Sequence, residues 1–211
     1  MKRYLILFLS LLAVGGCETA SQSAIRHTDL RLFVDDLNRS MEAAAAEKEG
    51  HFSSVIYRRY SDRPFKDLPT PELVEVGMAQ NAIDKVYNPG STLPAGERSA
   101  VLSEYAAKGV PLAQFAWGGE ILLRTHESAL GAEYVRRSAL QGCPPAQALL
   151  SYLYWKGIGL SRDKTRAYGW ADSASYAGLD SATRLRAEIG PALNPAQLQE
   201  AKAISAAWRQ Q

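Results

Sequence analysis

Apolar side chains recur at helical spacing along most of the chain, most clearly over residues 146–182. Two segments there repeat their apolar residues every three to four positions, which puts these residues on one face of an α-helix. The apolar positions are Ala146, Leu149, Leu150, Leu153 and Tyr154 in the first segment, and Ala167, Trp170, Ala171, Ala174 and Ala177 in the second. A pair of helices with such faces cannot bury them alone, so the pattern predicts neighbouring helix pairs of the same shape.

A short turn separates the two predicted helices and carries residues typical of helix ends. Gly157 and Gly159 can adopt the positive φ that often follows a helix. Asp163 can accept hydrogen bonds from the free N–H groups that open the next helix. The sequence therefore predicts a compact helix-turn-helix unit here.

Three glycines mark an internal repeat. Gly109, Gly142 and Gly178 are 33 and 36 residues apart, and each follows a segment that contains alanine. The spacing is typical of helix-pair repeats. The periodicity predicts helices at 95–108, before Gly109, and at 112–124 and 128–141, between Gly109 and Gly142. The turn at 125–127 lacks the glycine pair, so we interpret this unit as a degenerate repeat.

The flanking segments are also predicted to be helical. A helix at 27–48 has apolar residues at helical spacing, and a second at 70–87 begins with a threonine cap and a proline. Residues 50–71 are less regular. We expect a short helix and a loop there, whose aromatic and arginine side chains form either a contact surface or part of the core. The turn-rich segment 88–94 separates this part from the repeats, and a capped final helix follows Asn194.

The first residues have the pattern of a targeting segment. Lys2 and Arg3 precede an apolar run at 4–14, which is too short for a membrane-spanning helix of about 20 residues. The Val-Gly-Gly-Cys motif ending at Cys17 resembles a bacterial lipobox. That resemblance implies a diacylglyceryl group on Cys17 and cleavage just before it. Plain secretion, with loss of the leader, is the alternative. Because Glu18 rather than aspartate follows the cysteine, the resemblance favours the outer membrane, on its periplasmic side.

The repeat residues resemble those of the Sel-like repeats, which are related to tetratricopeptide repeats. The matching positions are Leu150, Tyr154, Gly157, Gly159, Leu160, Asp163, Ala167, Trp170, Ala174, Gly178 and Ala182. The resemblance covers residues 100–190, and Ser151 departs from it where the family usually has glycine. It implies an all-α fold, an α-solenoid of helix pairs with an N-terminal helical extension. The expected regions are a leader (1–16), a lipidated tether (17–26), an N-terminal helical region (27–92), the repeats (93–190) and a capping helix (191–211).

Charge and residue chemistry give no sign of catalysis or of nucleic-acid binding. The net charge is +2, and Lys2 and Arg3 of the leader account for it, so the rest of the chain has no basic excess. The histidines His27, His51 and His126 lie in separate segments without metal-ligand spacing. No phosphate-binding or hydrolase motif occurs. With Cys17 lipidated, Cys143 has no partner for a disulfide, and we expect a packed thiol there. We therefore predict no cofactor, no metal and no enzymatic activity.

What remains is a binding surface. Stacked helix pairs form a curved array, and we expect the first helix of each pair to line its concave face. The candidate partner contacts on that face are Gln114, Trp117, Gln147, Ser151 and Trp155. By resemblance, the partner is another envelope protein, in an envelope, secretion or polysaccharide-export complex. Two alternatives stay open: an enzyme or inhibitor acting on peptidoglycan or β-lactam-like substrates, although no SxxK motif occurs, and a purely structural envelope protein. The oligomeric state is left open.

Overall fold

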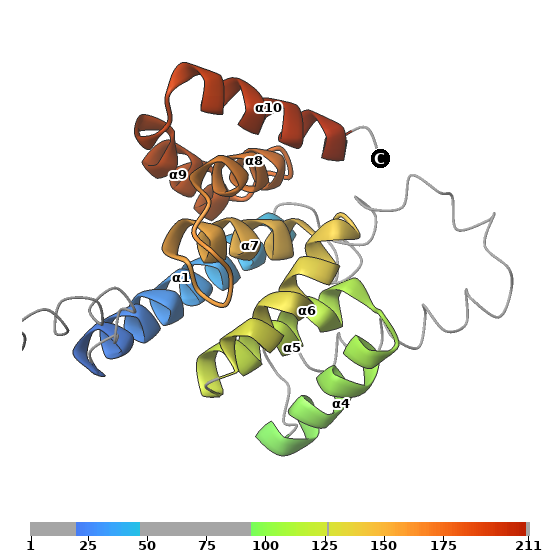
Figure 1. The fold of residues 1–211 in the computed structure, drawn as a ribbon. Helices are drawn as coiled ribbons and strands as arrows, with labels where there is room; N and C mark the ends of the chain where they lie inside the picture. Colours follow the sequence, from blue (N-terminus) through green and yellow to red (C-terminus); the bar gives the residue numbers. More distant parts are fainter. Residues whose placement is uncertain (1–19, 47–93, 126, 210–211) are drawn as a thin grey trace, which may run out of the picture.

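The computed structural model describes residues 20–46, 94–125 and 127–209, and in these ranges all regular structure is helical (Figure 1). The helices are α1 (Ala20–Ala46), α4 (Ala95–Ala107), α5 (Pro111–Arg124), α6 (Ser128–Leu140), α7 (Pro144–Lys156), α8 (Lys164–Ser175), α9 (Asp180–Ile189), the 3₁₀ helix η2 (Gly190–Ala192) and α10 (Pro195–Arg209). Among the helices of these ranges, none combines the length and the apolar content that crossing a membrane requires. The predicted elements at 50–71 and 70–87 lie outside the described residues.

The helices from α4 onward form the predicted α-solenoid. Each helix packs on the next along the chain, from α4 on α5 through α8 on α9, and α10 packs back on α8 (Figure 1). The pairs are therefore α5 with α6 and α7 with α8, while α9 packs on α8 as the next helix and α10 also packs on α8. Since α5 contacts α7, the first helices of the two pairs lie next to one another, and α7 also contacts α9. The prediction of an all-α helix-pair solenoid is confirmed.

Close packing between helices depends on small residues at particular crossings. A side chain at Gly118 in α5 would begin 2.8 Å from the carbonyl oxygen of Gly131 in α6, and one at Gly131 would begin 2.7 Å from Leu122. The same holds between α8 and α10, where a Cβ on Gly169 would lie 3.0 Å from the oxygen of Ala201. Because glycine occupies these crossings, the backbones of α5 and α6, and those of α8 and α10, approach each other closely.

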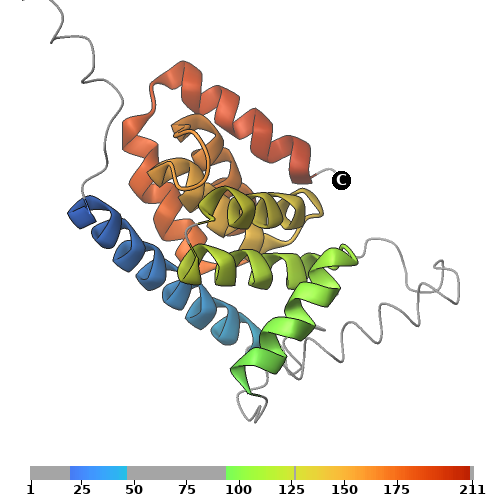
Figure 2. The same cartoon turned by 60° about the horizontal axis from the view of Figure 1, so that its bottom comes forward.

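Helix α1 lies across α5, α7 and α9 and contacts all three (Figure 2). It begins at Ala20, seven residues before the helix predicted at 27–48, so residues 20–26 of the expected tether belong to α1. Residues 20–26 have no apolar stripe, which is why periodicity missed them. They include good helix formers, and extending a helix already held by its apolar stripe costs little.

Candidate functional site

The turn between α7 and α8 has the predicted geometry. Gly157 and Gly159 have φ values of 72° and 67°, and the repeat glycines Gly109, Gly142 and Gly178 also have positive φ. The backbone N–H of Arg166 donates a hydrogen bond of 2.9 Å to Asp163 Oδ1, which caps α8. The apolar repeat positions are buried, namely Leu150, Tyr154, Ala167, Trp170 and Ala174. These residues form the interior of the repeat, so its outer surface is formed by other residues.

We had expected Gln114 to lie on an open surface because of its place on the first helix of a pair, but it does not. Its side chain is 4% exposed, and its Nε2 donates a hydrogen bond to the carbonyl oxygen of Ala106 at 3.3 Å. Its Oε1 accepts a hydrogen bond of 2.7 Å from Gln141 Nε2. Ala106 lies in the last turn of α4, where carbonyl groups lack helical partners, so the amide of Gln114 connects three helices.

Gln147 repeats this arrangement 33 residues later. It is also 4% exposed, donates to the carbonyl oxygen of Ala139 at the end of α6, and accepts from Ser173 Oγ at 3.0 Å. Ser151 is fully buried and donates a hydrogen bond of 2.6 Å to the oxygen of Ala167. The prediction that Gln114, Gln147 and Ser151 contact a partner on an exposed face is therefore wrong, because all three turn towards neighbouring helices of the solenoid.

The other two candidate contacts, Trp117 and Trp155, are half-buried. Trp155 Nε1 donates a hydrogen bond of 2.8 Å to Glu188 Oε1, and the guanidinium carbon of Arg162 lies 4.9 Å from the centre of its ring. These contacts hold the indole in place while part of it stays accessible. A partner contact at Trp117 and Trp155 stays a prediction.

The concave side of the first helices, which we expected to be open, is covered by α1. The apolar stripe of α1 packs into it, with Leu30, Leu37 and Met41 buried. The ring of Phe33 stacks on that of Tyr152 in α7, with the centroids 4.3 Å apart. Apolar burial and aromatic stacking contribute most of the free energy that holds such a helix in place.

Polar contacts fix where α1 lies on α9. Arg184 Nη2 donates to Asp36 Oδ2 at 2.6 Å, and the backbone N–H of Ser181 donates to Ser40 Oγ at 3.3 Å. These groups lie one turn apart on each helix, so together they set the register between α1 and α9. Sequence periodicity predicted an amphipathic helix here, but it gave no indication of the surface on which that helix packs.

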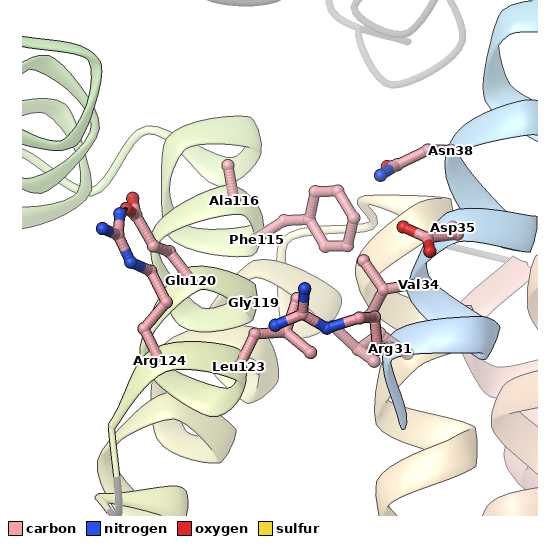
Figure 3. A pocket seen from close by; sticks show the side chains of 11 residues that line it. Arg31, Val34, Asp35, Asn38, Phe115, Ala116, Gly119, Glu120, Leu123 and Arg124 are labelled. Atoms are coloured by element: carbon pink, nitrogen blue, oxygen red, sulfur yellow. Dashed lines mark hydrogen bonds and ion pairs between the residues drawn. The ribbon is translucent and has the colours of Figure 1, made fainter. Parts of the chain in front are cut away.

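Between α1 and α5 there is a pocket of about 410 Å³ (Figure 3). Its apolar part is formed by Val34 of α1, by α5 and by one residue of α7, and its polar residues come from α1 and α5. The apolar lining is Val34, Phe115, Ala116, Gly119, Leu123 and Leu149, and the polar lining is Arg31, Asp35, Asn38, Glu120 and Arg124. In Figure 3 the side chains of Arg31, Asp35 and Asn38 extend from α1 towards α5, whereas Glu120 and Arg124 pair with each other on the far side of α5.

The described residues place no metal-binding cluster in this pocket. Among them no group of three or more His, Cys, Asp or Glu side chains could hold a metal ion. Cys143 is buried, and burial raises the pKa of its thiol to about 11, which keeps it protonated at neutral pH. The chemistry available in the pocket is thus apolar contact, charge pairing and hydrogen bonding.

Comparison with known proteins supports the fold. No protein-family model matches the chain, and no curated protein matches it. A solved structure that resembles it is that of c5321, described as a protective antigen present in uropathogenic Escherichia coli strains and displaying an SLR fold. The two share 22% sequence identity and a TM-score of 0.54, over 89% of this chain and 47% of the other. The chain thus spans about half the length of that protein. At this identity the likeness concerns the fold alone, and it agrees with the helix-pair solenoid: the chain is similar to Sel-like repeat proteins in architecture.

Proposed function

We propose that this chain is a non-enzymatic adaptor that binds another protein of the bacterial envelope. Repeat proteins of this architecture generally serve in protein–protein interaction. One observation supports the proposal most: the first helices already hold a polypeptide segment, α1, by an apolar stripe, an aromatic stack and an ion pair. A helix or strand of another protein would be held by contacts of the same kinds.

We further propose that a lipid on Cys17 anchors the chain at the periplasmic face of the outer membrane. The support is the leader: a basic start, a short apolar run and small residues before the cysteine. Several acyl chains on one residue hold a protein durably, since each buried CH₂ contributes about 0.8 kcal/mol. An adaptor in this place would serve an envelope, secretion or polysaccharide-export complex.

The adaptor role is tested by photo-crosslinking in intact cells. A crosslinking amino acid is placed at Trp117 or at Trp155, and in a control at Leu130, which is exposed on a second helix. We expect one envelope protein to crosslink from the two tryptophan positions and not from Leu130. Absence of any crosslink from both tryptophan positions would contradict the proposed adaptor role.

The anchor is tested independently. Metabolic labelling with radioactive palmitate should mark the wild-type chain, and Cys17→Ser should abolish the label and release the chain from the membrane fraction. A labelled Cys17→Ser variant would show that the lipid is attached elsewhere.

A further inference from the structure

We propose that the pocket between α1 and α5 binds a short extended segment of the partner protein, in which an apolar side chain stands between an acidic and a basic one. This inference rests on the proposed adaptor function and names the chemistry of its ligand. It concerns the part of the concave side that α1 leaves open, since α1 forms one wall of the pocket and α5 the other (Figure 3).

The interior of the pocket suits an apolar side chain. Its volume of about 410 Å³ lies in the range of known ligand sites, about 300 to 1,000 Å³. Phe115 and Leu149 line it, with the half-buried Val34 and Leu123 beside them. A Cβ built on Gly119 would meet no atom within 4 Å, so there is open space above this residue.

The edge of the pocket carries two opposite charges, and neither makes an ion pair with any described residue. Arg31 and Asp35 are exposed, and their side chains extend from α1 towards α5 (Figure 3). Within the described ranges neither makes an ion pair or a side-chain hydrogen bond, whereas Glu120 on the opposite wall is paired with Arg124. An acidic group of a ligand is therefore expected at Arg31 and a basic group at Asp35.

The spacing of these charges fits an extended peptide. Arg31 and Asp35 are four residues apart on a helix, which is about 6 Å along its axis. Alternate residues of an extended chain are about 6.6 Å apart and point to the same side, and the residue between them points to the other side. The two charged side chains of the ligand would thus face α1 while the middle side chain enters the apolar part of the pocket.

The proposal is tested with synthetic fluorescent peptides and the chain from residue 17 onward, carrying Cys17→Ser. The peptides have Glu-Leu-Lys, Glu-Leu-Glu or Lys-Leu-Lys at their centre, and binding is measured by fluorescence anisotropy. We expect Glu-Leu-Lys to bind at least threefold more tightly than the other two. Asp35→Lys should shift the preference to Glu-Leu-Glu, and Arg31→Glu should shift it to Lys-Leu-Lys, because each variant changes one charge of the pair. Both positions are exposed, so the fold tolerates the changes.

A substitution that fills the pocket gives a second readout. Gly119→Leu should weaken the binding of all three peptides by about tenfold or more, since its side chain occupies the space above Gly119. The matched control is Gly96→Leu in α4, another helical glycine with no atom within 4 Å of its Cβ, which does not line the pocket. It should leave binding unchanged.

Several results would overturn the proposal. The first is an unchanged peptide preference in both charge variants, and the second is equal binding by Gly119→Leu and wild type. The third is a change of oligomeric state in Gly119→Leu without loss of peptide binding, which would show that a second copy of the chain occupies the pocket. If Gly119→Leu still crosslinks its partner in cells from Trp117 and Trp155, the pocket proposal fails while the adaptor function stands. If no partner crosslinks to the wild type, the adaptor function itself fails.

Discussion

Two glycines in one turn make a matched pair for testing how the repeats are joined. Gly157 and Gly159 both have positive φ, so an alanine at either position is held in the left-handed region. Their surroundings differ. A Cβ at Gly157 would lie 3.4 Å from the nearest atom, in Arg162, which is ordinary contact. A Cβ at Gly159 would lie 2.2 Å from the carbonyl oxygen of Ser128, at the start of α6 in the preceding pair.

The expected costs follow from these distances. A left-handed alanine costs roughly 1–2 kcal/mol, and the loss of glycine's freedom in the unfolded chain recovers part of this, so Gly157→Ala should lose about 1 kcal/mol. Gly159→Ala carries the same strain. In addition, two backbone segments must move apart by about 1 Å, and overpacking of this kind costs about 1–3 kcal/mol. The total for Gly159→Ala is therefore about 2–4 kcal/mol.

The assay is unfolding of each variant by urea and by heat, followed by circular dichroism. In a chain of this size 1 kcal/mol corresponds to about 2–4 °C in Tm, so Gly157→Ala should lose about 3 °C and Gly159→Ala about 4 to 16 °C. Equal losses in the two variants would refute the reasoning. Equal losses would mean that an added Cβ at Gly159 does not clash with α6 and that the positive φ alone determines the loss of stability.

Four further predictions concern three side chains within the solenoid. Gln147→Ala should lower the free energy of unfolding by about 1–3 kcal/mol because it removes both hydrogen bonds of the buried amide and leaves the buried hydroxyl of Ser173 without its acceptor, and a loss in urea below about 0.5 kcal/mol would contradict this. Asn194→Ala should cost about 1 kcal/mol, since Asn194 and Gln197 cap α10 with reciprocal hydrogen bonds of 2.9 and 3.1 Å; an unchanged urea midpoint would refute it. Cys143 should react with a thiol reagent only after unfolding, and fast reaction of the native chain at pH 8 would count against its burial. The raised pKa of Cys143 also predicts how stability depends on pH. Between about pH 9 and pH 11 the thiol is deprotonated in the unfolded chain but not in the folded one, so the free energy of unfolding measured in urea should fall as the pH rises. A rise would contradict the raised pKa.

The helix-pair solenoid could be predicted because local signals agree with one another there. Leu149, Leu150 and Leu153 define the buried face of α7, and a glycine ends the helix, so periodicity and capping chemistry gave the same boundaries. The same holds for α10, where Asn194 and Gln197 form the predicted capping box. Such features are encoded within a few residues of one another.

The candidate site could be predicted only in part because it depends on long-range packing. Gln114 and Gln147 look like surface residues by polarity, yet each donates a hydrogen bond to a carbonyl at the end of a preceding helix. One signal was present: each glutamine is 33 residues from the other, as are the two alanines whose carbonyls they reach. Nothing in the apolar stripe of α1 identifies α5, α7 and α9 as its neighbours, so the pocket along α1 could not be predicted from local pattern.

The start of α1 has a consequence for how the molecule stands in the envelope. Ala20 is three residues after Cys17, and three residues reach at most about 11 Å. With the proposed lipid in place, the segment between Cys17 and α1 is too short for the solenoid to move far from the bilayer. Helix α1 then connects the headgroup region rigidly to the solenoid. A force applied to a bound partner would be transmitted to the membrane through the same helix that forms one wall of the pocket.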